Sequence, residues 1–139
     1  MGELPTVDVV TISRHFRPQT INAYLNVTPI KDLSDPDSPG PEATDERGRS
    51  SQIFLVDVVV RRGSEKRRTT ARGRDIYAIT APIVAEATER VLDGRCKRAG
   101  IGSTGETFEA MSFLRALAPE LYFEVTEMSG GSGELFRHA

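Results

Sequence analysis

The stretch from Arg72 to Gly94 constrains the fold most, because it joins the end of a strand to the clearest helix signal in the chain. Ile76–Ile79 predicts a short extended run. Pro82 follows where a first helical turn begins, and Gly94 is a natural stop. Apolar side chains at helical spacing predict one buried face, with a charged, solvated face opposite. The apolar set is Ile83, Val84, Ala87, Val91 and Leu92, and the charged set is Glu86, Glu89, Arg90 and Asp93.

A hairpin precedes this stretch. The alternating residues of 52–61 predict the central strand of a sheet. One face, formed by Phe54, Val56, Val58 and Val60, is wholly apolar, and we expect it to lie on helices. The other face carries Asp57 and suits a polar cavity. The turn at 62–65 leads into 66–73, which is polar on both faces and is therefore predicted to be either an edge strand or a solvated strand.

The remaining elements are shorter. We predict a first strand at 6–13, a short helix at 19–26, a helix at 104–118 opened by the capping box of Ser103 and Glu106, and a last strand at 121–126. This order predicts an α+β fold, an antiparallel or mixed sheet with helices packed on one face. We expect one domain over 1–127 and a flexible tail at 128–139.

Residues 29–51 have the composition of a mobile surface loop. Four prolines fall there among Asp, Ser, Gly and Glu, and almost nothing is available to bury. So long a loop inside a compact domain is either a lid over a site or an insertion without consequence.

Composition narrows the class of protein. The chain has 139 residues, 38% of them hydrophobic, a net charge of −2 and one cysteine, Cys96. We therefore expect no nucleic-acid partner, no membrane span, no disulfide and no metal, and we expect a cytoplasmic protein without a signal peptide.

Three motifs favour structural roles. Gly100–Gly105 reads GxGxxG, but no buried parallel strand precedes it, so helix capping is the better interpretation. The basic residues between Arg61 and Arg74 suit a solvated face, although Arg72 and Arg74 are well placed for an anionic ligand. Cys96 lies beside the cations Lys97 and Arg98, which suit a reactive thiol. No base is evident near it in the sequence, so we assign the thiol no reaction.

Four residues are candidates for catalysis. Asp75 suits a helix-terminus anion or an acid–base group, and Tyr77 suits a donor to a developing oxyanion. His15 suits a general acid or base, a role that histidine often fills, and Tyr24 is a weaker candidate of the same kind as Tyr77. The structural alternatives stay open: Asp75 pairs with an arginine, Tyr77 packs in the core and His15 is hydrogen-bonded.

Three ordered segments carry a family resemblance. Val9–His15 resembles the VVT(I/V)PRH strand of saccharopine dehydrogenase-like proteins, the group of trans-acting enoyl reductases, with Ser13 in place of the proline. Gly73–Thr80 with Val84–Ala87 is similar to their GxDxYxxT stretch, and Gly105–Phe108 with Phe113–Leu117 to their GEAFD and FLxAL ending. The family's Rossmann domain has no counterpart in this chain, so we expect no nicotinamide cofactor and no redox activity.

The resemblance implies the substrate-side domain of that family, which often makes dimer contacts. Because the group is widespread in natural-product pathways, it implies a cofactor-independent cyclase or isomerase acting on a polyketide-like intermediate in an apolar cavity. The alternative is a non-catalytic binding subunit or dimerisation module. It would be either a homodimer through the 53–60 strand or its sheet, or a partner of a Rossmann-containing reductase.

Overall fold

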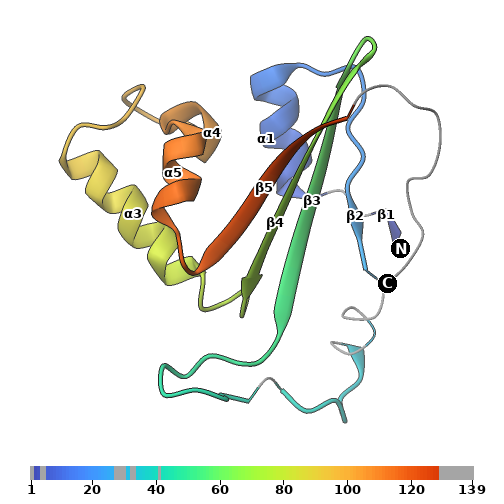
Figure 1. Cartoon of the computed structure of the whole chain (residues 1–139), viewed down its shortest axis with the longest axis vertical. Coiled ribbons are helices and arrows are strands. Elements are labelled where there is room, and N and C mark those ends of the chain that lie inside the picture. The colour runs from blue at the N-terminus through green and yellow to red at the C-terminus, as the bar shows by residue number, and fades with distance from the viewer. Residues whose placement is uncertain (1, 4–5, 27–30, 32–33, 41, 129–139) are drawn as a thin grey trace. The chain divides into compact units, whose positions relative to one another are not determined.

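The computed structural model describes residues 2–3, 6–26, 31, 34–40 and 42–128 (Figure 1). Helices and two antiparallel sheets make up the chain, which confirms the predicted α+β class. The chain divides into two compact units, where the sequence predicts one domain. The smaller comprises Met1–Gly40 and Cys96–Glu109, and the larger comprises Pro41–Arg95 and Ala110–Ala139. Most of the predicted tail, from 129 onward, lies outside the described residues.

The larger unit is built on a three-stranded antiparallel sheet with the order β3-β4-β5 (Figure 1). The strands are β3 (Ile53–Arg62), β4 (Glu65–Arg74) and β5 (Leu121–Met128). The hairpin is confirmed, but the prediction that 52–61 is the central strand is wrong, and so is the edge alternative for 66–73. The polar strand β4 pairs on both sides and is central, whereas the apolar strand β3 is an edge. β4 tolerates this position because its charged side chains stay at the surface and bond to neighbouring strands.

Two helices of the larger unit, α3 (Thr80–Leu92) and α5 (Ala110–Ala116), lie on the same side of β5 (Figure 1). The buried apolar residues of this unit are Ile79, Phe113, Leu117 and Leu121. Helix α3 starts at Thr80, ahead of the first turn predicted at Pro82, and ends before Gly94 as predicted. Its predicted faces are wrong at Arg90 and Leu92. Arg90, placed on the solvated face, is only 3% exposed, whereas Leu92 is 82% exposed. Arg90 is buried because it bonds to Glu86 and to Ser112 of α5.

The smaller unit contains α1 (Val7–Phe16), a two-stranded sheet of β1 (Gly2–Glu3) and β2 (Tyr24–Leu25), and the single-turn helix α4 (Thr104–Thr107). The predicted strand at 6–13 is therefore wrong, because this segment is helical. Asp8 in the first turn and Arg14 and His15 in the last turn complement the helix dipole. The predicted helix at 19–26 is also wrong, since Tyr24 and Leu25 pair with β1.

The helix predicted at 104–118 is interrupted. Ser103 and Glu106 form the predicted capping box, but Phe108 adopts extended backbone angles (φ −116°, ψ 158°) and ends α4. Helix α5 starts two residues later, in the larger unit. None of the helices in the described ranges is long and apolar enough to cross a membrane.

Candidate functional site

Asp75 organises the junction between β4 and α3. The sequence predicts an extended run at 76–79, but these residues form a turn. The Asp75 carboxylate accepts hydrogen bonds from the backbone N–H groups of Ser50 (2.8 Å), Tyr77 (3.0 Å) and Ala78 (3.0 Å). Asp75 itself lies in the left-handed region at φ 57°, which aspartate tolerates better than most residues. The turn forms because one carboxylate satisfies three backbone donors.

This environment favours the ionised form of Asp75. The Ser50 N–H, followed by those of Ala78 and Tyr77, holds the pKa of Asp75 below its ordinary value of 3.8. A general base that works near neutral pH needs a raised carboxyl pKa. The geometry thus corresponds to the predicted helix-terminus anion, and proton abstraction by Asp75 would have to compete with three hydrogen bonds.

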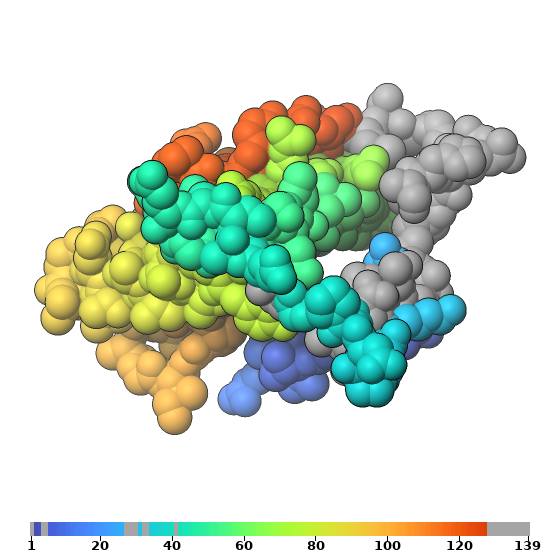
Figure 2. Space-filling model, turned by 90° about the horizontal axis from the view of Figure 1, so that it is seen from below, coloured from blue at the N-terminus to red at the C-terminus, as the bar shows by residue number. Residues whose placement is uncertain are grey.

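The second half of the predicted loop is held in place by Asp45. Its carboxylate accepts from the backbone of Arg47 (3.0 Å) and Arg49 (2.9 Å) and from the Arg49 guanidinium (2.8 Å). Residues 42–50 lie against the end of the sheet and the start of α3 (Figure 2). These bonds favour a fixed segment at 42–50 over a mobile lid. Residues 29–30, 32–33 and 41 of the predicted loop lie outside the described residues.

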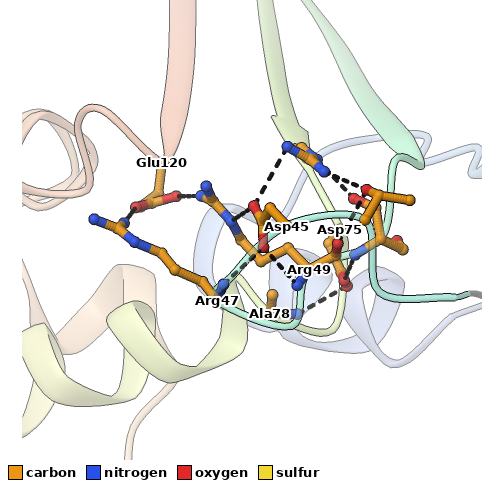
Figure 3. Close-up of polar contacts among 9 residues, drawn as sticks. Asp45, Arg47, Arg49, Asp75, Ala78 and Glu120 are labelled. Atoms are coloured by element: carbon orange, nitrogen blue, oxygen red, sulfur yellow. Dashed lines mark hydrogen bonds and ion pairs between the residues drawn. The ribbon is translucent and has the colours of Figure 1, made fainter.

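A cluster of charges fastens this segment to the sheet (Figure 3). Glu120, just before β5, accepts from Arg49 (2.6 Å) and Arg47 (3.1 Å). At the end of β4, Arg74 donates to the Ser50 carbonyl (2.6 Å) and lies 3.4 Å from Asp45. The arginines therefore already have acidic or carbonyl partners.

An open depression of about 260 Å³ lies beside this cluster. It is lined by Arg47, Arg49, Arg74, Ala78, Ile79, Pro82 and Glu120. An anionic ligand would have to displace Glu120 or Asp45 from the guanidinium groups. Arg74 therefore has a structural role: it holds residues 45–50 at the end of β4, and these contacts indicate no catalytic role for it.

The four predicted catalytic residues fall in different units. Asp75 and Tyr77 share one turn, but the Tyr77 side chain is 69% exposed. In the smaller unit, His15 Nδ1 lies 3.7 Å from Glu106 Oε1, and Tyr24 lies on the exposed strand β2. The pKa of Glu106 is lowered mainly by the Ser103 N–H. Because Glu106 belongs to the capping box of α4, its contact with His15 favours the structural alternative for His15.

Three basic residues of the hairpin have partners within the sheet. Arg68 donates to both Asp57 oxygens (2.8 and 2.9 Å), Arg67 pairs with Glu127, and Arg72 lies over the Tyr122 ring. Asp57 therefore bonds along the sheet surface, which favours a structural role over the predicted cavity. The solvated-face interpretation of the basic cluster describes these contacts well.

The apolar face of the sheet extends well beyond its buried end. Leu121 is buried, and the half-buried Phe54 lies against Gly73. Farther along, Val56, Val58, Val60 and Val125 are 49%, 48%, 60% and 47% exposed. The strand register places these four on one face, with Val58, Thr69 and Val125 in one row. We call these four valines the open face. The prediction that helices cover this face is wrong for its outer part.

No family model, curated protein or solved structure matches the chain. The resemblance to saccharopine dehydrogenase-like proteins therefore stays a prediction. It implies a strand at Val9–His15, where the structure has α1.

Proposed function

We propose that the chain is a protein-binding module and that the open face is its binding surface. The observation that carries the proposal is the exposure of four valines on one face of a regular sheet. Contiguous exposed apolar surface is a mark of interaction sites, whereas single exposed apolar residues are ordinary.

The surface has the anatomy of a binding site. Its valines flank Thr69 of the central strand, and such β-branched side chains lose little conformational freedom on binding. The ion pair of Arg67 with Glu127 (3.4 Å) borders it toward the hairpin and provides a polar rim. Burying one half-exposed valine contributes roughly 1 kcal/mol. Four of them supply a useful part of an affinity, to which a partner's contacts with the rim would add.

A cyclase or isomerase, which the resemblance implies, is supported less well. Such an enzyme holds its substrate in an apolar cavity, but the depression beside Asp75 is open and lined largely by charged side chains that bond to one another. The alternative of a binding subunit or dimerisation module agrees better with the exposed sheet.

Native mass spectrometry tests the proposal. The full chain is incubated with extract of its own cells, alongside Val125→Glu on the open face and Thr126→Glu on the opposite face. We expect the wild type and Thr126→Glu to retain a protein partner and Val125→Glu to lose it, because a carboxylate in an apolar interface must be desolvated. Equal retention by Val125→Glu and wild type would refute the role of the open face. A retained small molecule without any protein would favour the enzyme.

A further inference from the structure

The free edge of β3 is a second surface, distinct from the open face. β3 pairs with β4 over its whole length, from Ile53 with Arg74 to Arg62 with Glu65, without a break in register. Its other side has no partner strand in the described sheet. Natural sheets protect such edges with proline, bulges or inward-pointing charges. Residues 53–62 contain no proline, and the register contains no bulge.

The hairpin determines which backbone groups face this edge. A two-residue loop, Gly63 and Ser64, joins the strands, and Gly63 has a φ of 59°, as a type II′ turn requires. Such a loop closes on a hydrogen-bonded pair, here Arg62 with Glu65, and bonded pairs then alternate along the ladder. Asp57, Val59 and Arg61 therefore direct their backbone N–H and C=O groups toward the edge.

We propose that this edge pairs antiparallel with β3 of a second copy of the chain, around a two-fold axis at Val59. The two three-stranded sheets become one six-stranded sheet. The proposal does not depend on the proposed function, because the backbone edge and the open face are separate surfaces.

Charge selects the register. A two-fold axis at Val59 places Asp57 of each copy opposite Arg61 of the other, and Val58 opposite Val60. Opposite charges directly across an antiparallel pair stabilise it. Among the described residues Arg61 forms no ion pair, so its charge is available to a second chain. Asp57 keeps Arg68 on its own side.

Neighbouring registers are less favourable. An axis at Asp57 would bring two carboxylates opposite each other, and like charges in that position destabilise a sheet. An axis at Val58 would place Arg61 opposite Leu55 and Asp57 opposite Val59, leaving both charges without a partner across the interface. Only the register centred on Val59 matches acid with base at both ends.

Sedimentation velocity of the full chain, at concentrations up to about 100 µM, tests the pairing. We expect a dimer for the wild type, a monomer for Arg61→Asp, which faces Asp57 with a like charge, and a dimer for the control Arg62→Asp. Arg62 has the same charge but lies on the other face of β3. A monomeric wild type, assemblies larger than a dimer, or an Arg61→Asp variant that dimerises like the wild type would each overturn the proposal.

Cysteine cross-linking tests the register. In a Cys96→Ser background, Val59→Cys places two thiols across the axis, where Cα atoms of a bonded antiparallel pair are about 5.5 Å apart and within disulfide range. We expect a covalent dimer on mild oxidation for Val59→Cys and none for Val56→Cys or Val58→Cys. Cross-linking of either control in preference to Val59→Cys would overturn the register. Loss of partner proteins in Val125→Glu with an intact Val59→Cys cross-link would separate the two proposals.

Discussion

Replacing Arg90 by methionine should destabilise the larger unit more than the same replacement of an exposed arginine. The Arg90 guanidinium donates to Glu86 Oε1 (2.6 Å) and to Ser112 Oγ (2.8 Å), and it lies 5.1 Å from the centre of the Phe113 ring. It thereby joins α3 to α5. Methionine has similar length but can neither donate a hydrogen bond nor carry charge.

The magnitude follows from these contacts. Removing one partner of a buried ion pair costs about 3–5 kcal/mol when the other is left without compensation. Glu86 keeps Arg95 at 3.4 Å, which reduces that cost. The lost contact of the cation with the Phe113 ring is partly replaced by a sulfur–aromatic contact, worth about 1 kcal/mol. We therefore expect a loss of about 2–3 kcal/mol, or roughly 10 °C in the melting temperature for a chain of this size.

Thermal and urea unfolding, followed by circular dichroism, measure this effect. Arg47→Met is the matched control, since Arg47 pairs with Glu120 but is 72% exposed. Exposed ion pairs contribute about 0–1 kcal/mol, so this variant should melt within about 3 °C of the wild type. If Arg90→Met and Arg47→Met melted together, the inference that a buried arginine holds α3 against α5 would be refuted.

Two further predictions concern the C-terminal end of β4 and the segment bonded to it. A Cβ at Gly73 would lie 2.5 Å from Phe54 Cζ and 3.0 Å from the Glu120 carbonyl oxygen, so Gly73→Ala should lower the free energy of urea unfolding by about 1–3 kcal/mol. Adding Phe54→Leu to Gly73→Ala should restore part of the lost stability. An unchanged stability of Gly73→Ala would contradict this packing. The lowered pKa values of Asp75 and Asp45 mean that the unfolded chain takes up their protons first, so stability should hold above about pH 4 and fall as the pH drops through the folded values. Asp75→Asn should reduce this acid dependence, and an unchanged pH profile would show that the carboxylate is not held as described.

Elements whose signals are local were predictable from sequence. The hairpin is specified by alternating strands and a glycine-containing turn, and Gly63 takes the positive φ that the turn needs. The start and end of α3 and the capping box at Ser103 likewise depend on residues close in sequence. The class and the hairpin therefore follow from short-range chemistry.

Other elements depend on contacts distant in sequence. The valines in Val7–Phe16 favour a strand by propensity, yet these residues form the helix α1. Its ends carry charges that suit a helix. Arg90 is buried only because Ser112 and Phe113 come from another helix. A single sequence does not reveal such partners, so the solvated face of α3 was assigned incorrectly.

The candidate site shows the same division. Because Asp75 precedes the helix signal, the sequence makes it a candidate for a helix-terminus anion or an acid–base group, but its bond to Ser50 spans 25 residues and has no sequence signal. The roles of Asp45 and Glu120 were missed because both belong to segments that look solvated. The three valines of the open face that lie on β3 follow from the alternation of 52–61, but the alternation alone does not show that they are exposed.

The two edges of the sheet explain why assembly should stop at two copies. β5 carries Glu124 and Glu127 among its eight residues, and such charges oppose pairing of β5 with another β5. β3 instead carries one acid, already compensated by Arg68, and Arg61, which has no ion-pair partner among the described residues. Antiparallel pairing at Val59 uses both charges and covers the long unprotected edge. It also brings Val58 of each copy beside Val60 of the other, so dimerisation would double the open face and give a protein partner a larger continuous surface.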